Sequence, residues 1–158
     1  MPSVDLTCVA LPEWRGDLRA VAGLMEATWP EHYGPNGPGF ALADVAERHA
    51  GPELPWGVVA VADDRVVGTA ALAELSFGAR PGEGPWLVGL AVAPHMRKQG
   101  IGTALVKACR AEAARRGAAA VYATTCNATG LLHRSGWQDL RTVDGWQVLR
   151  TVIHGAGM

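Results

Sequence analysis

Alternating apolar and polar residues in several short stretches predict β-strands along much of the chain. The expected strands cover residues 4–11, 56–62, 66–75, 86–92, 119–125, 137–143 and 146–153. The run Trp86–Val92 is almost continuously apolar, which is typical of a central strand buried on both faces. Asp144-Gly145 separates the last two strands and predicts a two-residue hairpin turn.

Apolar residues recur at helical spacing between these strands. They predict helices over about residues 18–29, 42–49, 102–116 and 129–134, with Asp17 as the N-cap of the first helix. Residues 30–39 contain three prolines and three glycines, so we expect a loop there. The resulting order, β α α β β β α β α β β, predicts an α/β (α+β) domain with a mixed sheet flanked by helices. No linker is visible, so residues 1–158 are expected to form a single domain.

The charge of the chain is distributed unevenly. Net charge is −1, but residues 1–96 hold 5 Lys and Arg against 12 Asp and Glu. Residues 97–158 hold 9 basic residues against 3 acidic ones. This split favours an anionic ligand at the second half and a cationic ligand at the first.

Several classes of protein are disfavoured by the sequence. No apolar run approaches the roughly 20 residues that a membrane-spanning helix needs. The three cysteines, Cys8, Cys109 and Cys126, are too widely spaced for a zinc site or a disulfide framework. The first residues do not resemble a signal peptide. We therefore expect a cytoplasmic protein without a metal ion, a nucleic-acid partner or a membrane partner.

The stretch Leu90–Thr103 combines a strand end, a tight loop and a helix start, and it contains Arg-x-x-Gly-x-Gly at 97–102. Glycines let a backbone approach a ligand, and the free amides of a helix N-terminus attract phosphate. Three phosphate sites are conceivable. A Walker loop is absent, and a dinucleotide fingerprint would need glycine at position 105, where Leu105 stands. The third is an acyl-coenzyme A site.

Residues 86–137 resemble the GNAT superfamily of N-acetyltransferases. The matching pattern is Leu90-x-Val92-x-Pro94-x-x-Arg97-x-x-Gly100-x-Gly102, followed by a helix, a buried strand and a second helix that ends at Gly136-Trp137. The order of the remaining elements agrees as well. The resemblance implies a twisted sheet of about seven strands and acetyl-CoA as co-substrate. It also implies direct attack of a primary amine on the thioester in a ternary complex.

The resemblance further implies where the coenzyme binds. The strand over residues 86–92 should carry a bulge that frees its amides for the pantetheine arm. Relatives often hold coenzyme A through an asparagine at the position of Thr125, and Asn127 lies two residues further on. The expected coenzyme-binding residues are therefore Leu90, Ala91, Val92, Arg97, Lys98, Gln99, Gly100, Ile101, Gly102, Thr103, Thr125 and Asn127.

Two catalytic positions depart from the family pattern. Leu132 occupies the place of the tyrosine that often protonates the leaving thiolate, and the adjacent His133 is the candidate replacement. The strand 86–92 has no carboxylate to act as base, so Glu74 is the candidate. A chain of water molecules could also take the proton. A non-catalytic acyl-CoA-binding regulatory module remains the alternative function.

The acceptor is expected beside the loop after the first helix, because this loop borders the acceptor site in relatives. Trp29, Glu31, His32 and Tyr33 are the candidate contacts. A small-molecule or peptide amine is expected, without further identity. Because relatives often dimerise, a homodimer is also expected.

Overall fold

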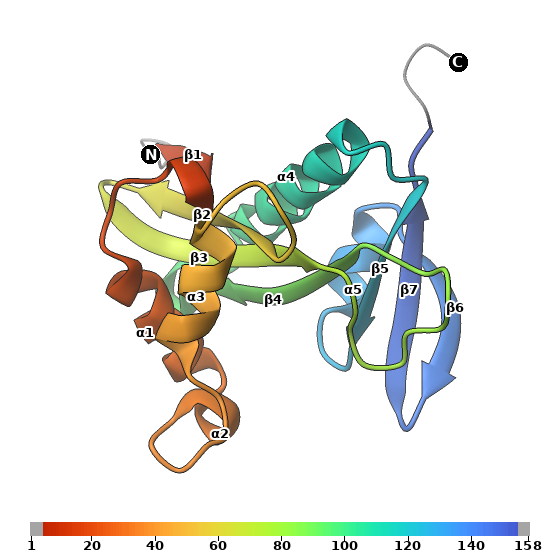
Figure 1. Ribbon diagram of the computed structural model, residues 1–158, viewed down its shortest axis with the longest axis horizontal. Coiled ribbons are helices and arrows are strands. Elements are labelled where there is room, and N and C mark those ends of the chain that lie inside the picture. The colour runs from red at the N-terminus through yellow and green to blue at the C-terminus, as the bar shows by residue number, and fades with distance from the viewer. Residues whose placement is uncertain (1–4, 155–158) are drawn as a thin grey trace.

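The computed structural model describes residues 5–154, which form one seven-stranded sheet in the order β1-β2-β3-β4-β5-β7-β6 (Figure 1). The strands are β1 Leu6–Ala10, β2 Trp56–Ala62, β3 Arg65–Ala73, β4 Trp86–Val92, β5 Ala120–Thr125, β6 Gln138–Val143 and β7 Trp146–Val152. The helices are α1 Leu18–Thr28, α2 Pro30–Tyr33, α3 Ala41–His49, α4 Ile101–Arg115 and α5 Thr129–Arg134. Short 3₁₀ turns, η1 and η2, cover Leu11–Glu13 and Pro94–Met96. The expected α/β architecture is confirmed.

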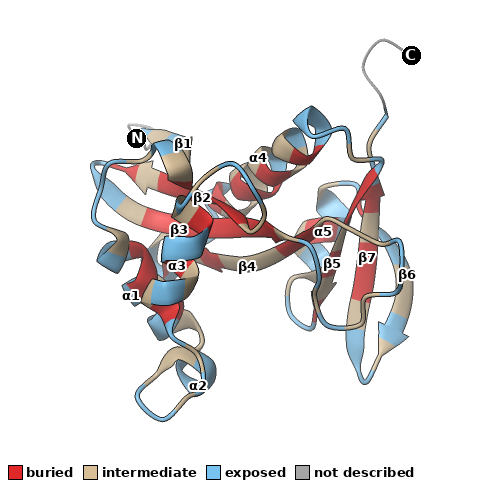
Figure 2. Ribbon diagram, in the orientation of Figure 1, coloured by how far each residue is buried: buried red, intermediate tan, exposed pale blue. Residues whose placement is uncertain are grey.

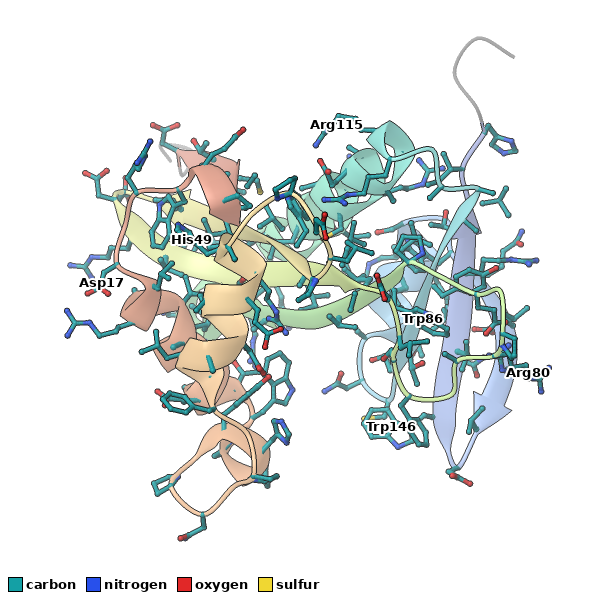
Figure 3. The ribbon with its side chains drawn as sticks, viewed as in Figure 1. Asp17, His49, Arg80, Trp86, Arg115 and Trp146 are labelled. Carbon is teal, nitrogen blue, oxygen red and sulfur yellow. The ribbon has the colours of Figure 1, made fainter. Side chains whose placement is uncertain are left out.

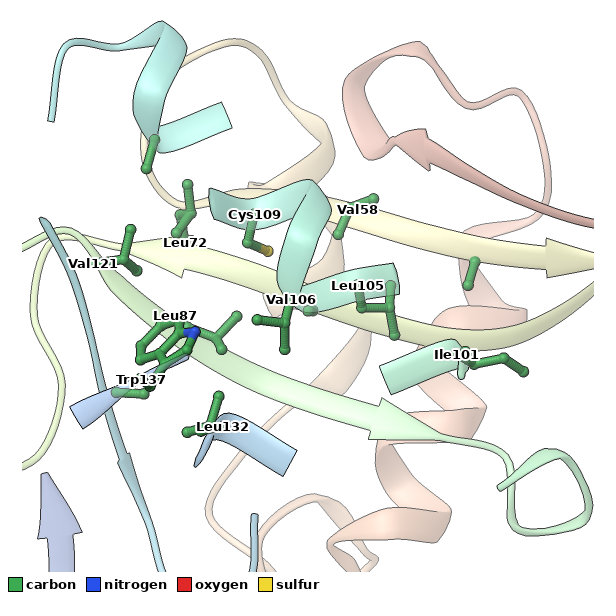
Figure 4. Close-up of a cluster of buried hydrophobic side chains, with 14 of the residues drawn as sticks. Val58, Leu72, Leu87, Ile101, Leu105, Val106, Cys109, Val121, Leu132 and Trp137 are labelled. Atoms are coloured by element: carbon green, nitrogen blue, oxygen red, sulfur yellow. The ribbon is translucent and has the colours of Figure 1, made fainter. Parts of the chain in front are cut away.

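Helices cover both faces of the sheet, and alternation within the strands supplies each face with apolar side chains. On one face Val59 packs with buried residues of α1 and α3, including Val21 and Val45. On the other face its neighbour Val58 packs under α4 with Leu105 and Cys109 (Figure 4). Buried residues accordingly follow the strands and the inner sides of these helices, as Figure 2 shows. The sheet thus has a packed hydrophobic core on each of its two faces.

The sheet divides between β4 and β5. These parallel strands pair only at Trp86 with Tyr122 and at Leu87 with Ala123. Beyond Leu87 they diverge, and β4 turns away from the β5-β7-β6 unit in Figure 1. The β3–β4 register shifts between Thr69 and Ala71, so β4 carries the expected bulge. Gly89, with φ +62, lies within that irregular stretch. The divergence leaves one edge of β4 without a neighbouring strand.

The predicted elements match the structure except in details. Asp17 caps α1 as expected, accepting a hydrogen bond from the Arg19 amide at 2.9 Å. The expectation of a plain loop over residues 30–39 is wrong, because residues 30–33 form the short helix α2. Its first residue is Pro30, whose fixed φ suits a helix start. The first expected strand includes Val4, which lies outside the described residues. No helix within residues 5–154 is long and apolar enough to cross a bilayer.

Candidate active site

The divergence of β4 and β5 opens a cleft with two adjoining cavities, of about 510 Å³ and about 280 Å³. Trp29, Leu90, Asn127 and Ala128 border both. The larger cavity lies along the end of β4 and the start of α4. The smaller lies between β4 and β5 and reaches Trp146, at the turn of the β6–β7 hairpin (Figure 3). The cleft therefore has a loop end and a strand end.

Most of the expected coenzyme residues surround the larger cavity. Those that line it are Leu90, Ala91, Val92, Arg97, Lys98, Gly100, Ile101, Gly102, Thr103 and Asn127. Gly100 is the N-cap of α4 at φ +83, a conformation that favours glycine. Buried Ile101 fixes the first turn of the helix in the core. The free amides of this turn and its dipole make a ready anion site.

Basic side chains surround the same cavity. Arg97 and Lys98 line it, and the Arg97 Nε donates to the Val92 carbonyl at 3.3 Å. Arg134, from the last turn of α5, also lines the cavity and was missed by sequence reasoning. The family pattern contains no signal for it, although a basic residue in a short helix beside the motif is a usable clue. Gln99 is exposed and does not line the cavity; its amide lies 4.0 Å from the Met96 sulfur.

Thr125 and Asn127 meet in the turn between β5 and α5. The buried Thr125 hydroxyl accepts hydrogen bonds from the amides of Asn127 at 3.2 Å and Ala128 at 3.0 Å. Both residues line the smaller cavity. The Thr125 hydroxyl also donates to the Asn127 Oδ1 at 3.4 Å, so the side-chain NH₂ of Asn127 is the group that is available for a ligand.

The four expected acceptor contacts differ in whether they reach the cleft. Trp29 lines both cavities, whereas Glu31, His32 and Tyr33 line neither. The Tyr33 hydroxyl donates to the Asp44 carboxylate at 2.6 Å, and the His32 ring packs edge-on against Tyr33. Burial and the hydrogen bond to Asp44 raise the pKa of Tyr33 to about 12. Tyr33 therefore stays protonated at neutral pH and is no base.

Neither candidate acid–base residue reaches the cleft. Glu74 borders a separate cavity beside Gly84 and Arg116, next to the closed end of the β4–β5 pair. His133 is 48% exposed and binds the Asp139 carboxylate at 2.8 Å. Its neighbour Leu132 faces the cleft instead, only 2% exposed in the core, because adjacent helix positions point in different directions. The structure does not bring Glu74 and His133 together or place either beside the cleft.

The lining of the two cavities contains no Asp, Glu, His or Tyr among residues 5–154. Two contributors that sequence reasoning did not assign to the site are Ser76 and Trp146. Trp146 is 42% exposed and packs edge-on against Phe77, with ring centroids 6.2 Å apart. The cleft therefore offers backbone groups, cations, aromatic rings and the exposed thiol of Cys126.

Comparison with protein families shows to which family the chain belongs. The model of the acetyltransferase (GNAT) family matches residues 21–137, most of the chain. The chain belongs to the GNAT acetyltransferase family. This GNAT protein is accordingly an acetyl-CoA-dependent acetyltransferase, and the cleft with its α4 loop fits acetyl-CoA as co-substrate. No curated protein sequence gives a significant match to it.

Solved structures share the fold of this GNAT protein at low sequence identity. An aminoglycoside N-acetyltransferase in complex with CoA is 19% identical, with a TM-score of 0.73 over 90% of this chain and 93% of that chain. A putative GNAT acetyltransferase from Desulfovibrio desulfuricans is 21% identical, with a TM-score of 0.70 over 95% and 99%. An N-acetylglutamate synthase from Neisseria gonorrhoeae, complexed with coenzyme A and N-acetyl-glutamate, is 16% identical. Its TM-score is 0.68 over 94% of this chain and 35% of that chain.

Proposed function

We propose that this protein transfers the acetyl group of acetyl-CoA to a primary amine by direct attack in a ternary complex. The observation that carries the proposal is the unpaired edge of β4 beyond Leu87. A pantetheine arm can occupy this edge as an added strand would, with its amides bonding to the free groups of β4. The thioester then lies between the two cavities, where an acceptor amine can reach it.

Each part of the cleft has a role in this reaction. The α4 amides, with Arg97, Lys98 and Arg134, hold the pyrophosphate. Asn127 and the β4 edge hold the pantetheine. The amine nitrogen forms a bond to the acetyl carbon, the carbon–sulfur bond breaks, and the thiolate leaves. Free β4 amides are available to stabilise the oxyanion that develops on the carbonyl oxygen.

Proton transfer is assigned to water rather than to a side chain. Glu74 and His133 lie away from the cleft, and Tyr33 is protonated at neutral pH. The main contribution of the protein is then positioning, because holding two reactants together supplies a large share of the rate. An amine that is already neutral is the reactive species. We therefore propose that the rate follows the ionisation of the acceptor.

The proposal is tested by incubating the protein with acetyl-CoA and a panel of amines and measuring the release of free thiol. We expect turnover with at least one class of amine, and a rate that rises with pH until the amine of that acceptor is neutral. The control replaces each amine with the matching alcohol, which should give no thiol above background. No turnover with any amine, together with no calorimetric binding of acetyl-CoA, contradicts the proposal.

A second candidate is a regulatory module that binds acyl-CoA without turning it over. Leu132 favours it, because it places a buried apolar side chain where relatives often have an acid. Tight binding of acetyl-CoA without thiol release for any amine supports the module. Thiol release that depends on the amine excludes it.

A further inference from the structure

Arg48 is a buried cation on the inner side of α3, and the residue is only 8% exposed. It belongs to the same buried row as Ala41 and Val45, where an apolar residue is normal. Its Nη1 donates only to the Met25 sulfur, at 3.8 Å. Among residues 5–154 no carboxylate lies within 4.0 Å of the guanidinium. A thioether is a weak acceptor, so the other compensation for the charge comes from the Tyr33 hydroxyl, with which the Arg48 side chain also interacts.

Two glycines on the strands make room for this side chain. A Cβ at Gly57, on β2, would stand 3.0 Å from the Arg48 Cβ. A Cβ at Gly89, in the β4 bulge, would stand 3.0 Å from Nη1 and 3.3 Å from Nη2. Glycine weakens a strand and marks close approach by another group. Any other residue at Gly89 would press on the guanidinium and would also have to adopt φ +62.

Gly89 connects Arg48 to the active site, because it lines the smaller cavity together with Leu90 and Trp29. Arg48 itself lines neither cavity; its guanidinium lies directly behind the Gly89 backbone, beside the unpaired edge of β4. It also lies close enough to the Tyr33 hydroxyl to oppose the rise in the pKa of that group. Within residues 5–154 each nitrogen of Arg48 either has a hydrogen-bond partner or contacts solvent. An N–H group that contacts solvent can be reached by a small anion.

We propose that Arg48 binds a carboxylate of the acceptor, so that the acceptor is an amino acid or a related amino carboxylate. The inference rests on the proposed function, since it names the substrate class of the same cleft. A guanidinium holds a carboxylate through two parallel hydrogen bonds, which offsets the cost of burying both charges. The amine must reach the β4 edge next to Gly89, so amine and carboxylate are separated by only a few bonds.

The competing explanation is that Arg48 only supports the β4 bulge. If Arg48 only supports the backbone, its replacement should change the affinity for every acceptor alike, whether or not the acceptor carries a carboxylate. A binding role affects only acceptors with the negative charge. The two explanations are separated by comparing each acid with its neutral amide of nearly the same size.

The binding experiment needs no turnover. N-acetylglycine, N-acetylmethionine and N-acetylphenylalanine, each with its carboxamide, are titrated by calorimetry into the complex of the protein with coenzyme A. We expect at least one acid to bind roughly 10-fold or more tightly than its amide, as for a charge-assisted pair. Arg48→Met should abolish that preference without changing the affinity for coenzyme A. No preference in any of the three pairs, or a preference retained in Arg48→Met, overturns the inference.

Two further variants exclude a general effect of removing an arginine. Arg110→Met removes a half-buried arginine on α4, whose Nη2 donates to the Val152 carbonyl at 3.0 Å, and should leave the preference intact. Arg48→Lys keeps the charge but loses the planar fork, and should retain part of the preference. Thermal unfolding of all three variants shows whether they are folded. Loss of the preference in Arg110→Met as well as in Arg48→Met contradicts the binding role.

Rate measurements separate this inference from the proposed function. If amino acid amides are acetylated as fast as the acids, the inference fails and acetyl transfer to amines stands. If no amine is acetylated but the acids bind in a manner that depends on Arg48, the proposed function fails and the subsite stands.

Discussion

The two ends of the cleft are built in different ways. At the coenzyme end, a single continuous segment, residues 90–103, supplies most of the lining, and Asn127 and Arg134 complete it. At the acceptor end, side chains from α1, the β3–β4 connection and the β6–β7 hairpin converge, among them Trp29, Ser76 and Trp146. A backbone site depends on local sequence, whereas a converging side-chain site depends on the whole fold. The first can therefore be recognised from a motif, and the second appears only in three dimensions.

The largest effect is expected at the coenzyme end, from Gly100→Glu. Gly100 has φ +83, and a Cβ there meets nothing within 4 Å. The new carboxylate would repel the pyrophosphate, so we expect the affinity for acetyl-CoA to fall roughly 100-fold or more. Gly117→Glu is the matched control, because Gly117 has φ +80 and equally open surroundings. Calorimetry should show normal binding for the control, and normal binding by Gly100→Glu would contradict the site.

At the acceptor end, Trp146→Ala should raise the KM for the acceptor about 30-fold, the order of effect seen for a buried aromatic anchor. The affinity for acetyl-CoA should stay unchanged, because Trp146 borders only the smaller cavity. Phe40→Ala, which removes a 67% exposed ring that does not line the cleft, is the control. Steady-state kinetics with each substrate varied in turn measures both constants. A parallel loss of affinity for acetyl-CoA would show that the two ends are not separate.

The smallest effect is expected where the β3–β4 connection is anchored. Glu83 binds Arg141 of β6 through two hydrogen bonds of 2.7 and 2.5 Å, and Arg141 also donates to the Gly78 carbonyl at 2.6 Å. Glu83→Gln should lower the free energy of unfolding by about 1.5 kcal/mol, since it breaks a charge-assisted pair. Denaturant unfolding at pH 6 measures this loss. The connection carries Ser76 and Phe77, so only the acceptor end should be disturbed.

The same pair has a defined pH dependence. The hydrogen bonds from Arg141 lower the pKa of Glu83 to about 2, from an ordinary value of 4.5. A carboxyl group with a depressed folded-state pKa stabilises the fold fully above its unfolded pKa. That contribution is lost as the pH falls from about 4.5 towards about 2, so the difference between wild type and Glu83→Gln should shrink at pH 3. Asp17→Asn, at an exposed ion pair and a helix cap, should change stability little at either pH.

Sequence patterns were reliable where local chemistry decides the outcome. Alternation, continuous apolar runs and turn residues together located all seven strands to within about two residues, because each reports which faces are buried. The helix α3 was located too, but its buried side only in part. The pattern pointed to Leu42, Val45, Ala46 and His49; of these Val45 is buried and Leu42 packs against the core, whereas Ala41 and Arg48 are buried and were not expected to be. A charged residue in a buried row defeats hydrophobic periodicity, and that exception is the residue proposed here to bind the acceptor.

The candidate site shows the same limit. The Gly-rich loop was predicted residue by residue, and only Gln99 lies off the cavity. Glu74 and His133 were chosen for their chemistry and their closeness in sequence to expected positions. Their directions depend on where β3 ends and which side of α5 faces the core, and neither can be read from one sequence. Arg134 and Trp146 reach the cleft from elements that carry no motif.

The two residue pairs that join β4 to β5 have a mechanical consequence. Within residues 5–154 these pairs are the ladder contacts that join two parts of the sheet, β1–β4 on one side and β5, β7 and β6 on the other. α4 packs on strands of both parts of the sheet. In the proposed binding mode, coenzyme along the β4 edge would take the place of the missing ladder bonds and connect the two parts of the sheet. Binding of the coenzyme should then raise the free energy of unfolding, because a ligand that binds only the folded state stabilises that state.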